Sequence, residues 1–269
     1  MTFVFPPGEK EAKFKINGTP IAHSFEMSIL GKRKREYDLR FENPCAFILA
    51  GPTMSGKTTF VFNLLRHIDT LFVNPKCKQN VLYFYNRKQD GFDLFKKENI
   101  VKEWIHALPS TDQIEEKTEA YKNRGGSVVI IDDFMDELNK DTAQIFTSMR
   151  HHLDFVLILM IQNLFSSNPV FRTISLNATY ILIFKNVRDA SQIQSFAKQF
   201  APGEAGWVVN AFKNATRRAH SYVLFDCNGA APYELKIRSH MLPHELPIRV
   251  YMDKSTSREQ LASNDVSTE

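Results

Sequence analysis

One eight-residue segment carries the strongest chemical signal in this sequence. Gly51–Thr58 (GPTMSGKT) fits the pattern Gly-x-x-x-x-Gly-Lys-Ser/Thr at every fixed position. Glycines permit a turn tight enough for successive backbone N–H groups to point into one concavity, which suits phosphate oxygens. We therefore expect ATP to bind in a cradle that continues into the following helix, built from Gly51, Pro52, Thr53, Met54, Ser55, Gly56, Lys57, Thr58 and Thr59. The pattern places Lys57 on the β- and γ-phosphates and the Thr58 hydroxyl on Mg²⁺.

A second segment could supply carboxylates to the same pocket. Val128–Ile131 (VVII) is an apolar run that ends in Asp132 and Asp133. An apolar strand of this kind delivers a carboxylate to the carboxyl edge of the sheet, where Asp132 can hold Mg²⁺. Asp133 can orient or deprotonate an attacking water. The alternative for Asp133 is a helix N-cap.

Three further residues are weaker candidates for catalysis. Gln162 ends the next apolar run, so its amide can sense the γ-phosphate or hold water, although an ordinary strand-end amide would read the same way. Ring-forming ATPases also supply an arginine to the active site of the neighbouring subunit. Arg150 precedes one strand and Arg188 follows another, so either could serve, and a solvated surface position is equally compatible with each.

The segments that must position these residues alternate between short apolar runs and amphipathic stretches. Five apolar runs read as strands buried on both faces, and helices are expected between them. This alternation predicts an α/β fold with a mostly parallel sheet, flanking helices and a P-loop NTPase (RecA-like) core. The expected strands are 46–50, 81–85, 128–131, 155–161 and 180–184, the expected helices include 94–106, 142–149 and 203–212, residues 109–124 read as an exposed connection, and 222–225 with 233–237 read as a closing hairpin.

Composition limits the class of protein without naming its partner. The chain has 269 residues, a net charge of +4 and 43% hydrophobic residues, which is ordinary for a globular protein. Its apolar runs are far shorter than the roughly 20 residues of a membrane span, and no signal peptide is expected. Three widely spaced cysteines (Cys45, Cys77 and Cys227) are expected to be reduced thiols in an intracellular compartment. Lys32–Arg35 and the group Lys213, Arg217 and Arg218 are candidate phosphate contacts, with solvated surface as the alternative.

The chain divides into three parts by composition. Residues 1–40 read as an N-terminal arm, 41–250 as the P-loop ATPase domain, and 251–269 as a disordered tail rich in Ser, Thr, Asp and Glu.

These residues together resemble the genome-packaging ATPases of the FtsK/HerA superfamily, particularly those of poxviruses and of Polinton/adintovirus-type elements. The resemblance covers roughly residues 44–225 and rests on four blocks: Gly51–Thr58, Val128–Asp133, Met149–Phe165 and Ile183–Ile193. The block that ends in Gln162 and follows an Arg/His-rich turn is the discriminating one, because many P-loop proteins share only the first two.

The resemblance implies roles and partners that spacing and composition do not. It makes Asp132 the Mg²⁺ ligand, Asp133 the water-activating acid, Gln162 the sensor and Arg150 the preferred trans-acting arginine. Several members of the superfamily carry Glu where this chain has Asp133. It further implies a homo-oligomeric ring, a pentamer or hexamer, that threads double-stranded DNA into a preformed capsid and docks on capsid or portal-vertex proteins. The location would be the nucleus or cytoplasm of a host cell, or the virion.

Two other functions compete with DNA translocation. A nucleotide-dependent switch or small-molecule kinase would share the phosphate loop, but the sequence carries no Asn-Lys-x-Asp guanine-reading motif, and 109–124 is acidic where a kinase lid would gather arginines. A protein remodeller of the AAA type would append a helical lid after the core, whereas 222–237 reads as a hairpin. Stimulation of ATP hydrolysis by DNA separates the first function from the others.

Overall fold

A ten-stranded sheet organises the chain. The computed structural model describes residues 2–4, 24–29, 32–73, 80–89, 91–165, 168–186, 190–245 and 247–252. In sheet order the strands are β1 (Thr2–Val4), β12 (Arg249–Tyr251), β11 (Ile237–Ser239), β10 (Tyr222–Asp226), β9 (Tyr180–Phe184), β4 (Ala46–Ala50), β8 (Phe155–Ile161), β7 (Ser127–Asp132), β5 (Val81–Tyr85) and β6 (Glu103–Ile105). A separate two-stranded antiparallel sheet pairs β2 (Ser24–Ile29) with β3 (Lys32–Asp38).

The site-bearing half of the sheet is parallel. Strands β9, β4, β8, β7, β5 and β6 all run in the same direction, so their carboxyl ends meet at one edge. At the other end, β10, β11 and β12 add antiparallel pairs. Every residue of β4 and β8 is buried, because helices cover both faces of a parallel sheet. The expectation of an α/β fold with a mostly parallel sheet is thus confirmed.

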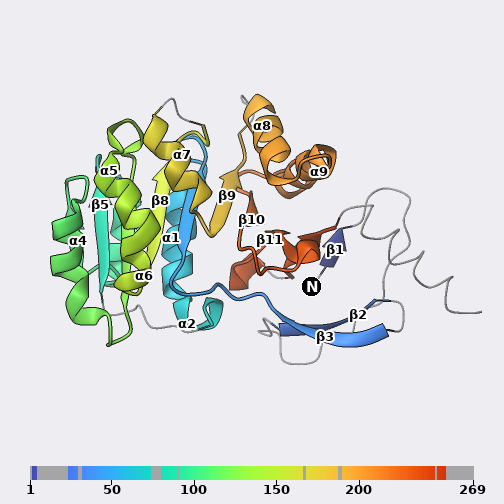
Figure 1. Cartoon of the computed structure of the whole chain (residues 1–269), viewed down its shortest axis with the longest axis horizontal. Helices are drawn as coiled ribbons and strands as arrows, with labels where there is room; N and C mark the ends of the chain where they lie inside the picture. The colour runs from blue at the N-terminus through green and yellow to red at the C-terminus, as the bar shows by residue number, and fades with distance from the viewer. Residues whose placement is uncertain are drawn as a thin grey trace, which may run out of the picture.

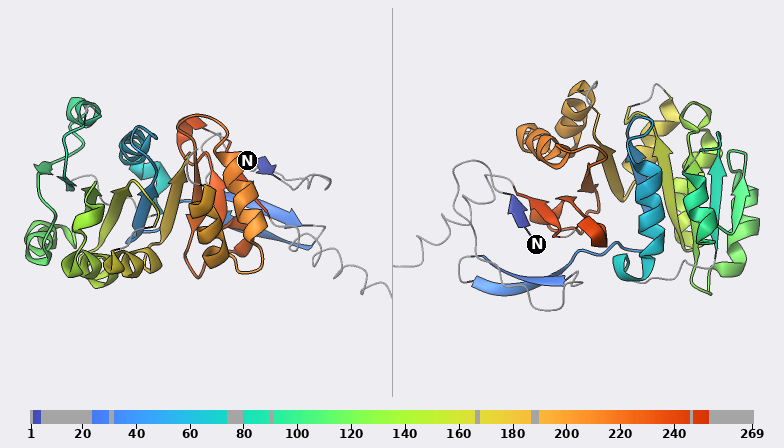
Figure 2. Two further views of the ribbon diagram at one scale, coloured as in Figure 1. Left: turned by 90° about the horizontal axis from the view of Figure 1, so that it is seen from above. Right: turned by 180° about the vertical axis from the view of Figure 1, so that it is seen from behind.

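Helices cover the two faces of the sheet and enclose two apolar clusters (Figures 1 and 2). One face carries α1 (Lys57–Arg66), α2 (Ile68–Leu71) and α3 (Phe92–Lys97). The other carries α4 (Thr111–Thr118), α5 (Lys140–Gln144), a π-helical turn (Ile145–Met149), α6 (Arg150–His152), α7 (Pro169–Leu176), α8 (Ala190–Phe200) and α9 (Ala205–Ala215). Short 3-10 turns span Glu119–Tyr121, Met135–Glu137, Tyr233–Leu235 and Pro243–Glu245. No helix within these described ranges is both long and apolar enough to cross a membrane.

Three expectations from the sequence are wrong in detail. The helix expected over 94–106 ends at Lys97, and Glu103–Ile105 instead forms the edge strand β6 beside β5. The supposed connection 109–124 contains α4, whose Ile114 is fully buried. In the closing hairpin the second strand begins at Ile237, because Tyr233–Leu235 forms a 3-10 turn. The proposed tail lies outside the described residues from 253 onward.

Candidate nucleotide-binding and hydrolysis site

The phosphate loop lies between β4 and α1, at the carboxyl edge of the parallel strands (Figure 1). Gly56 caps α1 with φ 103°, a left-handed conformation that glycine adopts without strain. The Lys57 ammonium donates hydrogen bonds to the carbonyl oxygens of Gly51 (2.5 Å) and Pro52 (3.0 Å), so the lysine folds over its own loop. The Ser55 hydroxyl is buried without a hydrogen-bond partner. An orphaned hydroxyl inside a loop of this shape fits a phosphate oxygen as its missing partner.

A loop far along the chain lies against the same cradle. A Cβ added at Gly56 would lie 3.2 Å from the Cβ of His220, which itself has φ 59°. His220 is exposed and follows Arg217 and Arg218 in the turn between α9 and β10. The sequence singled out these arginines only as DNA contacts, and nothing in its spacing shows that this turn lies beside Gly56. The turn lies beside Gly56 because β10 pairs antiparallel with β9, so that the start of β10 lies next to the end of β9.

Asp132 ends β7 beside the phosphate loop and is held by two donors. The Tyr83 hydroxyl and the Gln89 amide nitrogen both donate to Oδ2 of Asp132, each at 2.9 Å. The pKa of Asp132 is raised to about 7, chiefly by burial, and the Tyr83 hydrogen bond opposes that rise. The pKa of Lys57 is lowered by burial, and the charges of Asp132 and Asp133 counter the lowering. A lysine and two acids therefore act on one another electrostatically in this pocket.

Asp133 and Gln162 are brought together across adjacent strands. The Gln162 amide nitrogen donates to Oδ1 of Asp133 at 2.8 Å. Asp133 has φ 63°, and its backbone N–H donates to the Met160 carbonyl oxygen of β8. The left-handed turn directs the chain away from the sheet at this residue, and Asp and Asn are the non-glycine residues that tolerate it best. The helix N-cap considered for Asp133 is not what its carboxylate does here, because its side chain pairs with Gln162.

The residues suited to Mg²⁺ are Thr58 and Asp132. The Gln89 side chain joins them, because its Oε1 accepts from the Thr58 hydroxyl at 3.0 Å while its nitrogen donates to Asp132. Among the described residues no group of three or more His, Cys, Asp or Glu side chains could hold a metal ion. This donor set fits Mg²⁺, which typically takes one or two protein oxygens and completes its shell with phosphate oxygens and water.

The two candidate arginines lie outside this constellation. Arg150 is 7% exposed at the amino edge of the sheet, opposite the phosphate loop. Its guanidinium donates to the Thr179 hydroxyl (2.9 Å) and to the Asn177 carbonyl oxygen (3.1 Å) of its own chain. Arg188 falls outside the described residues.

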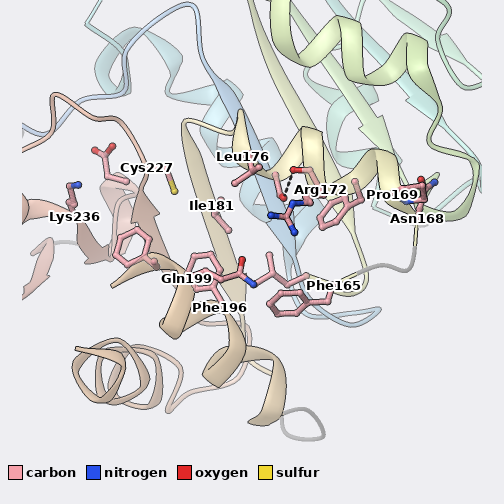
Figure 3. A pocket seen from close by; sticks show the side chains of 15 residues that line it. Phe165, Asn168, Pro169, Arg172, Leu176, Ile181, Phe196, Gln199, Cys227 and Lys236 are labelled. Carbon is pink, nitrogen blue, oxygen red and sulfur yellow. Dashed lines mark hydrogen bonds between the residues drawn. The ribbon is translucent and has the colours of Figure 1, made fainter. Parts of the chain in front are cut away.

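A separate cleft lies between α7 and α8, and it is not the nucleotide site. The cleft has a volume of about 830 Å³. Figure 3 shows the side chains that line it, with Phe165, Leu176, Ile181 and Phe196 among them. Mostly apolar side chains line it, and no phosphate-loop residue does. Its chemistry therefore does not suit a triphosphate.

Comparison with known proteins supports the fold. No family model and no curated protein sequence matches this chain. The genome-packaging NTPase B204 from Sulfolobus turreted icosahedral virus 2, in complex with AMP, matches with a TM-score of 0.51 and 15% identity, covering 73% of this chain and 96% of that one. The DNA-packaging ATPase B204 from Sulfolobus turreted icosahedral virus matches with a TM-score of 0.51, 14% identity and the same coverage. At such low identity the likeness shows a shared fold. Fold and phosphate loop together define this chain as a P-loop NTPase with a RecA-like core.

Proposed function

We propose that this protein is an ATPase of the FtsK/HerA type that drives double-stranded DNA into a capsid. The observation that carries the enzymatic part is the convergence of the phosphate loop, Asp132, and the Asp133–Gln162 pair at one sheet edge. The DNA-packaging part is supported by the resemblance in the sequence and by the shared fold with the B204 packaging NTPases. B204 has been seen with AMP and AMPPCP, which supports ATP as the nucleotide here.

The chain's own groups divide the work of holding the nucleotide. Lys57 would exchange its two carbonyl partners for phosphate oxygens, and the buried Ser55 hydroxyl would gain the partner that it lacks. Thr58 and Asp132 would hold Mg²⁺. A metal ion held by these two residues would supply positive charge that offsets the negative charge developing during phosphoryl transfer.

The Asp133–Gln162 pair is suited to handling the attacking water. Asp133 is partly exposed at the edge where the γ-phosphate would lie, and its carboxylate can accept a proton from water. Gln162 fixes one carboxylate oxygen through its amide N–H. Because Gln162 directly follows β8 at the same edge of the sheet, its amide is also placed to sense whether the γ-phosphate is present.

The remaining partners follow from the proposed function. We propose a homo-oligomeric ring, pentamer or hexamer, with double-stranded DNA as substrate and a capsid or portal-vertex protein as docking partner, in the host nucleus or cytoplasm or within the virion. The alternative is a nucleotide-dependent switch or small-molecule kinase that does not act on DNA.

The deciding experiment is the ATPase rate with and without double-stranded DNA, on material whose assembly state is measured alongside. We expect DNA to raise turnover severalfold in the assembled form. A rate that DNA leaves unchanged in a confirmed ring would favour the switch or kinase.

The same assay can locate the DNA contacts. Three groups of basic residues are candidates: Lys32–Arg35 in β3, the Lys213–Arg218 group, and Lys122 with Arg124, which line a hollow of about 680 Å³ together with Asp154. Each phosphate contact removed should reduce the log–log salt slope of DNA binding by about one unit. Because the Arg217–His220 turn lies beside Gly56, variants there also need a nucleotide-binding measurement. A cluster whose neutral variants keep the wild-type slope is solvated surface.

Arg150 remains our proposed trans-acting arginine, and its buried contacts predict a second effect. Arg150→Ala should lower the free energy of unfolding by about 1–3 kcal/mol, because it removes a buried side chain and leaves its half-buried partners at Thr179 and Asn177 without this donor. Urea titration would measure this, with the exposed Arg172→Ala as the matched control.

A trans role for Arg150 requires more than a stability loss. Folded Arg150→Ala rings should bind ATP and hydrolyse it poorly, and mixing them with Lys57→Ala subunits should restore part of the activity. Absence of recovery in rings shown to exchange subunits would leave Arg150 a structural residue and move the proposal to Arg188.

A further inference from the structure

One side chain that no motif identifies joins the two proposed metal ligands. Gln89 lies in the segment between β5 and α3 and is half-buried. Its amide oxygen accepts from the Thr58 hydroxyl at 3.0 Å, and its amide nitrogen donates to Asp132 Oδ2 at 2.9 Å. An ionised carboxylate can only accept, so an amide whose NH₂ end faces Asp132 and whose oxygen faces the Thr58 hydroxyl matches both partners. The amide thus lies between these two ligands, with its acceptor end toward the donor Thr58 and its donor end toward the acceptor Asp132.

Described residues before and after Gln89 also contact this site. Asn86 donates from its backbone N–H to the Asp132 carbonyl oxygen (3.1 Å) and from its side chain to the Asp133 carbonyl oxygen (3.0 Å). The same side chain donates to Glu137 at 2.8 Å. These hydrogen bonds hold Asn86, three residues before Gln89, against the turn that follows β7.

Gly91, two residues after Gln89, lies close to Thr58 in the first turn of α1. A Cβ added at Gly91 would lie 3.0 Å from Cγ2 of Thr58, so only a residue without a side chain fits there without a shift. Thr58 is consequently contacted by Gln89 through its hydroxyl and by the Gly91 backbone beside its methyl group. Asn86, Gln89 and Gly91 thus lie along the metal site from the Asp132 side to the Thr58 side.

We propose that Gln89 is a positioning residue that closes the metal site in the nucleotide-free protein and is displaced when Mg²⁺ and nucleotide bind. The Gln89 amide lies between the Thr58 hydroxyl and Asp132 Oδ2, in the position that a dication bound directly by both oxygens would take. On this proposal, Mg²⁺ binding displaces the amide, and the Gln89 side chain takes up a second arrangement. This proposal rests on the nucleotide site proposed above, and not on DNA as the substrate.

Gln89 variants should bind Mg²⁺-nucleotide more tightly if Gln89 closes the empty site, and more weakly if Gln89 supports the bound metal. Gln89→Ala removes contacts that the proposal assigns only to the free protein, so Mg²⁺-dependent nucleotide binding should tighten by roughly 3–10-fold, the equivalent of one net hydrogen bond. Gln89→Asn, too short to span both partners, should tighten binding similarly. If Gln89 instead supported the bound metal, both variants would bind Mg²⁺-nucleotide more weakly.

The measurement is equilibrium binding of a fluorescent ATP analogue, titrated with Mg²⁺ and repeated in excess EDTA, on the full chain. Gln194→Ala, an exposed glutamine on α8, is the matched control and should bind as wild type does. The EDTA arm should be nearly unaffected by Gln89→Ala, because the effect acts through the metal ligands. Unchanged or weakened Mg²⁺-dependent binding in the Gln89 variants would overturn the proposal while leaving the nucleotide site intact. A wild type that shows no Mg²⁺-dependent binding would overturn both.

Discussion

Lys57→Ala is expected to reduce ATP turnover at least about 100-fold while leaving the fold intact, since losing one preorganised hydrogen-bond donor to developing charge costs this much in other enzymes. The Lys57 ammonium bonds only carbonyl oxygens of its own loop, Gly51 and Pro52, and reaches neither apolar cluster. Its charge interacts with Asp132 and Asp133. Steady-state phosphate release at saturating ATP would measure the loss.

The control for this variant is another lysine in a helix. Lys198→Ala removes an exposed lysine from α8, so its turnover and circular dichroism should match the wild type. A folded Lys57→Ala protein that turns over near the wild-type rate would contradict the assignment of Gly51–Thr58 as the catalytic phosphate cradle.

The parallel core could be predicted because its strands are buried on both faces. Runs such as Ala46–Ala50 and Phe155–Ile161 contain no polar residue, and β4, β5, β8 and β9 have the bounds expected. Continuous burial removes the ambiguity between strand and amphipathic helix that shorter mixed segments carry.

The edge elements could not be predicted because tertiary contacts decide them. β6 has only three half-buried residues, and its Trp104 is fixed by stacking on Tyr83 at 4.8 Å between ring centroids. In sequence alone, Trp104 and Ile105 extend the apolar spacing of α3 and read as helix. α4 was obscured because Ile114 is its one large buried apolar residue within a charged segment, although Ser110 caps it through the Gln113 N–H.

The candidate site likewise contains residues that could be placed from the sequence and residues that could not. Residues at strand ends could be placed because parallel strands bring their carboxyl ends to one edge, which is how Asp132, Asp133 and Gln162 meet. The direct bond from Gln162 to Asp133 required the register of β7 against β8. Gln89 and His220 lie in irregular segments whose position depends on how loops close over the edge, and no residue spacing reports that.

Asp133→Asn should slow ATP hydrolysis by about 10²–10⁴-fold and leave Mg²⁺-nucleotide binding near the wild-type value, because it removes the proton acceptor and keeps both metal ligands. The substitution is sterically clean. Asn tolerates the left-handed conformation at φ 63°, and its Oδ1 can still accept from Gln162. Single-turnover hydrolysis and equilibrium nucleotide binding, measured on the same preparation, would separate the two effects.

Asp132→Asn is the matched comparison, one residue away on the same strand end. It should weaken Mg²⁺-dependent binding, since a neutral amide is a poorer ligand for a hard dication than the carboxylate that Tyr83 and Gln89 now hold. Binding in EDTA should change little in either variant. If the two variants lose Mg²⁺-dependent binding equally, Asp133 also helps to hold the metal, and the water-activating role must then pass to a group outside this pair.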